Sequence, residues 1–364
     1  MNTNICILMV SHNDLSEECL KSIVEARNHS TLKTTLVVID NASKKYQANE
    51  FVDRFIPDAI VLLRNGDFGF GRSNNRGARE VEAEYYFILN PDTVLTDPDI
   101  LNKFYNYMKT NPEVGLLAPK IFYMDGRLQE TCRRFPKWYM PFVQRSSLVR
   151  TAFGQGYAAS FVMKDYDHES SKDVDWVQGS AMFVDGQVWR QLEGFDDRYW
   201  LYFEDIDFCR RVHLLGKQVL YNPAMTLKHA HGKESAAYSN LIVNLMKKKE
   251  ARGHIASWLK YSWKWAGQTE PIVGAASNDV TLSVAEGSRT SGGDIVWPRV
   301  AITYLTYNGP ESYHDITRCL KSIQVADYPL DKLEVNCVEN PSPSGASWPF
   351  IEKEWLPLSE KSFP

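Results

Sequence analysis

The residues best suited to acid–base chemistry form a short acidic run, Glu204-Asp205-Ile206-Asp207. Apolar residues recur at helical spacing after this run, and Gly216 predicts the end of the helix. Asp205 is therefore expected at the start of a helix, where its carboxylate can face a cleft and accept a proton. The alternative is that Glu204 and Asp205 only cap the helix and interact favourably with its dipole.

A second group of residues has the chemistry of a metal site. Asn90-Pro91-Asp92 follows the apolar run 85–89, and a carboxylate in such a loop suits a hard divalent cation that also binds substrate phosphates. His229 and His231, separated by one residue, are further candidate ligands, and His229 is preferred. The alternatives are that Asp92 forms hydrogen bonds within a turn and that the histidines are structural.

The composition is that of an ordinary folded domain with no general attraction to nucleic acid. The chain has 364 residues, 44% hydrophobic and 24% charged, with a net charge of −4. Its six cysteines form no CxxC pair, which indicates free thiols in a reducing compartment. No apolar run approaches the roughly 20 residues of a membrane span. We expect a cytoplasmic protein whose contact with a membrane, if it has one, is peripheral.

Short apolar runs, typical of buried strands, alternate with segments of helical periodicity along the first part of the chain. Such alternation predicts an α/β fold with a mainly parallel sheet flanked by helices. The strands are expected at 5–10, 36–39, 61–63 and 85–89, and the first helix at 15–26.

Polar residues cluster just after these strands, at the sheet edge where α/β proteins bind ligands. They are Asn13, Asp40, Asn41, Asn90 and Asp92. A glycine-rich loop, Asn65 to Gly77, lies between the third and fourth strands and lets the backbone approach a ligand closely. It lacks the lysine of a phosphate-binding loop and the spacing of a dinucleotide fingerprint, and the alternative is a flexible turn before a helix.

The order of these motifs resembles the family 2 inverting glycosyltransferases of the GT-A fold, especially their rhamnosyltransferase-like branch. The resemblance covers about residues 4 to 240, and its ordered set is more specific than any single piece. The matching pieces are Ser11-His12-Asn13, Val38 to Ser43, Asn65 to Gly77, Asn90-Pro91-Asp92, Trp176 to Ala181, Gly194-Phe195-Asp196, Glu204 to Asp207, and His229 with His231. Arg133-Arg134-Phe135-Pro136 also resembles the rhamnosyltransferase-containing subgroup.

The resemblance implies a role for each matched residue. Asp205, with Glu204 beside it, matches the catalytic position and is implied as the general base. Asp92 with His229 or His231 is implied to bind Mg²⁺ or Mn²⁺, and Asn90 in place of an aspartate makes this site less anionic. The implied donor-nucleotide residues are Ser11, Asn13, Asp40, Asn41, Asn65, Gly71, Asn74 and Asn90, and the implied acceptor or sugar residues are Trp176, Gly179 and Asp207.

The expected activity is metal-dependent inverting transfer of a sugar, with dTDP-rhamnose as the suggested donor. The expected partners are a nucleotide-diphospho-sugar and a saccharide acceptor, either a growing surface polysaccharide or a lipid-linked oligosaccharide at the inner face of the membrane. Two alternatives remain: a non-catalytic sugar-binding or scaffold subunit, and a nucleotidyltransferase on a related fold. Retention of Asp92, Asp205 and His229 together argues against a scaffold.

The C-terminal part repeats the beginning of the chain. Val300 to Asn308 matches Ile5 to Asn13, and Cys319 to Ile323 repeats Cys19 to Ile23 residue for residue. We therefore expect a GT-A domain at 1–266, whose C-terminal segment 236–266 is helical, basic and rich in tryptophan. A linker at 267–296 and the start of a second, truncated GT-A domain at 297–364 are expected to follow.

Overall fold

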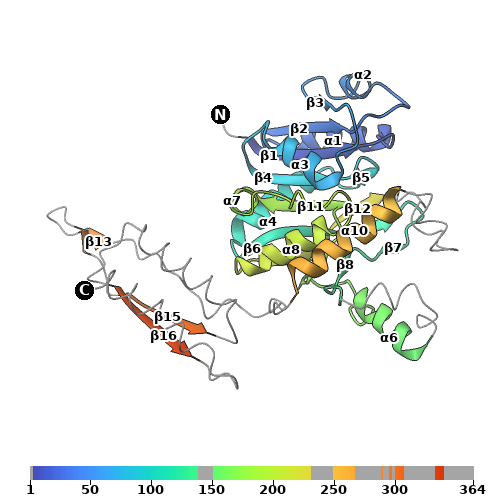
Figure 1. Cartoon of the computed structure of the whole chain (residues 1–364). Helices are drawn as coiled ribbons and strands as arrows, with labels where there is room; N and C mark the ends of the chain where they lie inside the picture. Colours follow the sequence, from blue (N-terminus) through green and yellow to red (C-terminus); the bar gives the residue numbers. More distant parts are fainter. Residues whose placement is uncertain are drawn as a thin grey trace. The chain divides into compact units, whose positions relative to one another are not determined.

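The chain forms two compact units, Met1–Ser277 and Asn278–Pro364 (Figure 1). The boundary falls within the segment 267–296 that the sequence predicts as a linker. The structure is a computed structural model that describes residues 3–137, 151–230 and 249–266 of the first unit, and 288–289, 295–296, 300–306 and 333–339 of the second.

The first unit is built on a mixed, mainly parallel sheet. The four apolar runs singled out in the sequence are strands β1 to β4, so this part of the prediction is confirmed. In spatial order the sheet contains β3 (Ile60–Leu63), β2 (Thr34–Asp40), β1 (Thr3–Ser11), β4 (Ala83–Leu89), β11 (Ala181–Asp185), β6 (Val114–Tyr123), β12 (Gln218–His229) and β5 (Thr93–Leu95). Two short strands are attached to it, β7 (Leu128–Gln129) on β6 and β9 (Lys172–Asp173) on β12.

Strand directions bring the ends of several strands to one edge of this sheet. β1, β2, β3 and β4 are parallel. β11 is antiparallel to both β4 and β6, so β6 runs in the direction of β4, and β12 is parallel to β6. The carboxyl ends of β1, β2, β4 and β12 therefore lie at the edge where β11 begins, which is the ligand-binding edge of open α/β sheets.

Helices cover both faces of the sheet. Successive side chains of each strand point to opposite faces, so the sheet contributes to two separate cores. Cys6 and Leu8 of β1 face one core, and Ile5 and Ile7 face the other. The first core is covered by α3 (Phe70–Ala78), α7 (Gly186–Gln191), α8 (Glu204–Leu214) and α10 (Lys249–Lys264). The second is covered by α1 (Glu17–His29), α2 (Ala48–Asp53) and α4 (Ile100–Thr110).

A small appendage lies beside the end of the sheet. It consists of α6 (Ala152–Phe161) and a two-stranded sheet of β8 (Cys132–Arg133) and β10 (Trp176–Val177). Trp176 pairs with Arg133 in this sheet, and the Trp176 indole donates a hydrogen bond to the Arg134 carbonyl at 2.8 Å. The appendage therefore brings a tryptophan and two arginines next to the chain that leads into β11.

The helix predicted at the acidic run is α8, and it begins at Glu204 and ends before Gly216, which has φ of 72°. Figure 1 shows α10 beside it. The two helices are joined through Asp207, which accepts hydrogen bonds from Trp265 Nε1 at 2.9 Å and from Arg211 Nε at 2.8 Å. Lys264 forms an ion pair with Asp207 at 2.7 Å.

The chain enters α8 through an unusual backbone conformation. Tyr202 and Phe203 have φ of 65° and 69°, a region that non-glycine residues rarely adopt. The His254 ring of α10 lies 5.1 Å from the Tyr202 ring and 5.5 Å from the Phe203 ring, and Ser257 Oγ donates to the Leu201 carbonyl at 2.9 Å. Helix α10 thus supports the turn that presents Glu204 and Asp205.

In the second unit, β15 (Val300–Thr306) pairs in parallel with β16 (Leu333–Glu339), and β13 (Ser288–Arg289) pairs with β14 (Ile295–Val296). Thr306 pairs with Glu339 at the end of the β15–β16 ladder, at the positions that match the Ser11–Asp40 pair ending the β1–β2 ladder. None of the helices within the described ranges is long and apolar enough to cross a membrane.

Candidate active site

Asp205 lies at the ligand-binding edge of the sheet, in the first turn of α8. Its Oδ2 accepts a hydrogen bond from the Gly179 N–H at 3.2 Å, and its Oδ1 accepts one from the Ile206 N–H at 2.9 Å. A Cβ added at Gly179 would lie 3.0 Å from the Phe70 ring and 3.8 Å from Asp205 Cβ, so a larger residue here would press on Phe70. Asp205 itself is partly exposed, as a base that reaches a substrate must be.

Opposing effects act on the proton affinity of Asp205. Burial raises the pKa of this carboxyl from its ordinary value, and the two backbone N–H groups and the positive charge of Arg133 partly offset the rise. A carboxylate whose pKa is raised is a stronger base, once ionised, than an ordinary aspartate.

Glu204 is a neighbouring carboxyl in a different environment. Only 4% of Glu204 is exposed, and its Oε2 has no hydrogen-bond partner among the described residues. Burial, followed by the negative charge of Asp205, raises the pKa of Glu204 well above its ordinary value. Glu204 packs beside Gly71, where an added Cβ would lie 3.4 Å from Glu204 Cβ. The two adjacent acids therefore differ, since Glu204 is buried against α3 whereas Asp205 reaches the sheet edge.

Asp92 and His229 meet at the same edge although they are far apart in the sequence. His229 Nε2 lies 3.0 Å from Asp92 Oδ1 and 3.3 Å from Asn90 Nδ2, and the backbone pairing of β12 with β5 places His229 opposite Thr93. The other ring nitrogen, Nδ1, donates to Gln129 Oε1 at 3.0 Å. This bond orients the ring so that Nε2 faces Asp92 and Asn90. Sequence reasoning missed Gln129, because no motif links it to His229.

The Asp92–His229 pair has suitable chemistry for Mg²⁺ or Mn²⁺, which bind to a few protein ligands and to substrate phosphates. One carboxylate oxygen and one imidazole nitrogen already lie within contact distance of each other. In the part of the chain that the structure describes, no group of three or more His, Cys, Asp or Glu residues is close enough to hold an ion. His231 lies outside the described residues.

Two buried side chains near the carboxyl ends of the strands retain polar atoms suited to a donor nucleotide. Asp40 is 5% exposed; its Oδ2 accepts from the Ser43 N–H at 3.0 Å, and its Oδ1 has no partner among the described residues. Asn74 is completely buried, and its Oδ1 is likewise unpartnered. Because an unpartnered buried oxygen is costly, these atoms suit hydrogen bonding to a ligand.

Other predicted nucleotide residues form hydrogen bonds within the protein and thereby shape the loops. Ser11 is completely buried with its Oγ 2.5 Å from the Tyr46 hydroxyl. Asn13, at φ of 68°, accepts from the backbone N–H groups of residues 44 and 45. Asn41 donates to the Gly69 carbonyl at 3.3 Å. Gly71 is buried against Phe195, and Asn65 is exposed.

The predicted acceptor residues separate into two groups. Gly179 contacts Asp205 directly, and Trp176 stands three residues before it, 4% exposed under the Arg133 side chain. Asp207, by contrast, is completely buried, and its partners are Tyr199, Arg211, Lys264 and Trp265. The expectation that Asp207 contacts a sugar is therefore corrected: its carboxylate is used to dock α10 on α8.

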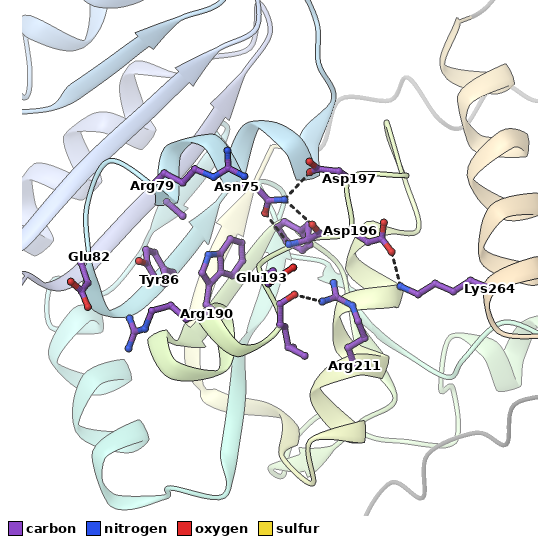
Figure 2. Close-up of a pocket in the computed structure, with 14 residues that line it drawn as sticks. Asn75, Arg79, Glu82, Tyr86, Arg190, Glu193, Asp196, Asp197, Arg211 and Lys264 are labelled. Atoms are coloured by element: carbon purple, nitrogen blue, oxygen red, sulfur yellow. Dashed lines mark hydrogen bonds and ion pairs between the residues drawn. The ribbon is translucent and has the colours of Figure 1, made fainter. Parts of the chain in front are cut away.

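A separate cavity of about 900 Å³ lies between α3, α7, α8 and α10. In Figure 2, Asn75 bonds to Asp197 and Lys264 bonds to Asp196 beside this cavity. Its lining carries both cations and anions, and Asp205, Asp92 and His229 are not among the lining residues. Because these three residues lie elsewhere, we do not assign the active site to this cavity.

Comparisons with known proteins identify the family of the chain. The family model described as "Glycosyltransferase like family 2" matches residues 5–243. Rhamnosyltransferase WbbL of Escherichia coli is 25% identical over 267 residues, 71% of this chain and 92% of that protein. An N-acetylglucosaminyl-diphospho-decaprenol L-rhamnosyltransferase of Mycobacterium tuberculosis is 25% identical over 227 residues, 56% of this chain and 70% of that protein.

Solved structures are also similar at low identity. The mannosyltransferase PcManGT of Pyrobaculum calidifontis, in complex with GDP-Man and Mn²⁺, gives a TM-score of 0.43 at 14% identity over 72% of this chain and 65% of that one. The TarS fragment of S. aureus in complex with UDP gives 0.43 at 12% identity over 72% and 73%. Because the family model matches residues 5–243, more than half of its length, the chain belongs to glycosyltransferase family 2.

Proposed function

We propose that the first unit is a metal-dependent inverting glycosyltransferase in which Asp205 is the general base. The observation that carries this proposal is the presence of two complementary groups at one sheet edge. One is a basic carboxylate held by the Gly179 and Ile206 N–H groups, and the other is the Asp92–His229 pair. Inverting transfer requires both functions, a proton acceptor for the attacking hydroxyl and a site for the leaving diphosphate.

The proposed reaction is a single displacement at the anomeric carbon. The acceptor hydroxyl bonds to that carbon as the bond to the diphosphate breaks, and the hydroxyl proton passes to Asp205. Asp92 and His229 would hold the divalent cation, which offsets the charge developing on the leaving group. Asp40, with its buried unpartnered oxygen, is proposed to bind the nucleotide.

We propose dTDP-rhamnose as donor and a surface polysaccharide or lipid-linked oligosaccharide as acceptor. The support is the similarity to two proteins named as rhamnosyltransferases, one of which is named for a diphospho-decaprenol acceptor. A thermal-shift screen of nucleotide sugars with Mn²⁺, followed by a donor-hydrolysis assay, tests the donor. Metal-dependent stabilisation and hydrolysis with dTDP-rhamnose are expected, and a response only to another donor would reject rhamnose.

We also propose peripheral contact with an anionic membrane through the outward side of α10, at the cytoplasmic face. Trp263 is 81% exposed and Leu259 54%, and Lys260 is exposed beside them. Tryptophan and lysine on one side of a helix suit the interface of such a membrane. Sedimentation with phosphatidylglycerol vesicles is expected to carry the protein down, and to fail for the double variant Leu259→Ser, Trp263→Ser. Equal sedimentation of both proteins would reject this surface.

For the second unit, we propose that residues 297–364 carry the first elements of another GT-A-like domain. The sequence repeat and the parallel β15–β16 pair support this. Catalysis is assigned to the first unit, which carries Asn90-Pro91-Asp92 and Glu204-Asp205.

A further inference from the structure

Arg133 is a cation held rigidly between two aromatic rings. Its guanidinium carbon lies 5.6 Å from the centroid of the Trp176 ring and 5.6 Å from that of the Phe161 ring. Trp176 is 4% exposed and Phe161 7%, and both rings are buried in the first core of the unit. Stacking of this kind orients a guanidinium group and leaves its N–H edge for ligands.

The hydrogen-bonding capacity of Arg133 is largely unused. Its NH2 group donates weakly to the Glu130 carbonyl at 3.4 Å, and its buried Nε has no partner among the described residues. The neighbouring Arg134 differs, because it donates to both carboxylate oxygens of Asp165, at 3.0 and 2.6 Å.

Arg133 is half-buried, and a partly desolvated guanidinium without a paired anion is energetically unfavourable. Burial lowers the pKa of Arg133, and the charges of Asp205 and Glu130 oppose this effect without an ion pair forming within the described residues. Arginine nevertheless stays protonated in proteins, so Arg133 cannot relieve the cost by losing its charge. An anion that arrives with a ligand would offset this charge.

Arg133 lies on the acceptor side of the candidate active site. It pairs with Trp176 across β8 and β10, and the turn that follows β10 contains Gly179, whose N–H donates to Asp205. The charge of Arg133 acts on Asp205. The site proposed for the donor diphosphate is instead formed by Asp92 and His229.

We propose that Arg133 binds a phosphate group carried by the acceptor, so that the acceptor is a glycosyl phosphate or diphosphate rather than a neutral sugar. This inference rests on the proposed function, since it takes Asp205 as the base beside the acceptor. The same chemistry could serve the donor diphosphate, and the experiment below separates the two sources.

The test compares two probes that differ only in the phosphate, N-acetylglucosamine 1-phosphate and methyl N-acetylglucosaminide. Their affinities are measured by calorimetry in EDTA, which removes the metal from the proposed donor site. The proteins are the wild type, Arg133→Gln, the charge-preserving Arg133→Lys, and the control Arg134→Gln, which removes an adjacent arginine already paired with Asp165. In a separate arm, dTDP affinity is measured with Mn²⁺.

We expect the wild type and Arg134→Gln to bind the phosphate probe about 10- to 100-fold more tightly than the neutral one, as a charge-assisted bond predicts. Arg133→Gln should lose this preference, and Arg133→Lys should keep part of it. Neither Arg133 variant should change dTDP affinity, and this result also shows that the variants are folded.

The inference is overturned if the wild type shows no preference, if Arg133→Gln retains it, or if the Arg133 variants lose dTDP affinity instead. Should Arg133→Gln fail to fold, the comparison of Arg133→Lys with the wild type decides in the same way. Absence of any donor turnover by the wild type is a different failure, because it counts against the proposed function and not against phosphate binding by Arg133.

Discussion

Replacement of Asp205 by asparagine should abolish most of the transfer activity without unfolding the protein. An amide of nearly the same shape cannot take the proton of the attacking hydroxyl, and losing a general base costs about 10² to 10⁴ in rate, or roughly 3 to 5 kcal/mol in barrier height. The amide oxygen can still accept from either the Gly179 or the Ile206 N–H, but not readily from both. The lost bond destabilises by about 1 kcal/mol, and removal of the repulsion with Glu204 offsets part of this.

The assay for this prediction measures transfer rate against pH together with nucleotide affinity. The wild-type rate should rise with pH through the pKa of Asp205, which lies above that of an ordinary aspartate, and the residual rate of Asp205→Asn should lack this limb. Asp125→Asn is a matched control, since this exposed turn residue pairs with its neighbour Arg127. A folded Asp205→Asn protein with the same rate as Asp125→Asn would remove Asp205 from the role of base.

Three further predictions follow from the same site and its support. Asp92→Ala should weaken Mn²⁺-dependent dTDP binding more than His229→Ala, because Asp92 contributes a negative charge to the proposed metal site. Calorimetry with and without Mn²⁺ tests this, and full metal dependence in Asp92→Ala would reject the metal site. Glu204→Gln should raise Tm at pH 8 but not at pH 4. Because folding raises the pKa of Glu204, the folded protein becomes less stable as the pH rises above the unfolded pKa of about 4.3, and glutamine removes this loss. An equal Tm difference at both pH values would contradict the burial of a titrating acid at this position. A chain ending at Ala266 should retain transfer, since α10 completes the contacts of α8; a folded but inactive fragment would show that the second unit is required.

Much of the fold could be predicted from the sequence because its signals are local. Continuous apolar runs such as 85–89 become buried parallel strands, and polar residues directly after them necessarily meet at one sheet edge. Asp205 at a helix start follows from the apolar spacing of α8 and from Gly216.

The contacts that were not predicted join distant parts of the chain. Gln129 orients His229 from 100 residues away, and Trp265 reaches Asp207 from 58 residues away. The sequence pattern made Asp207 look like a ligand residue, because local spacing cannot show that another helix will cover it. The different environments of Glu204 and Asp205 also depend on packing. Helix α3 packs against Glu204 and buries its carboxyl, whereas Asp205 remains at the sheet edge.

The stereochemistry of transfer tests the central claim most directly. The measurement is ¹H NMR of the product formed from a β-linked dTDP-sugar by the wild type with Mn²⁺, compared with the same reaction in EDTA. A single displacement assisted by Asp205 predicts an α-linked product that forms only with the metal. A β-linked product would require a different mechanism and would contradict the role assigned to Asp205, and an unchanged rate in EDTA would contradict the role assigned to Asp92 and His229.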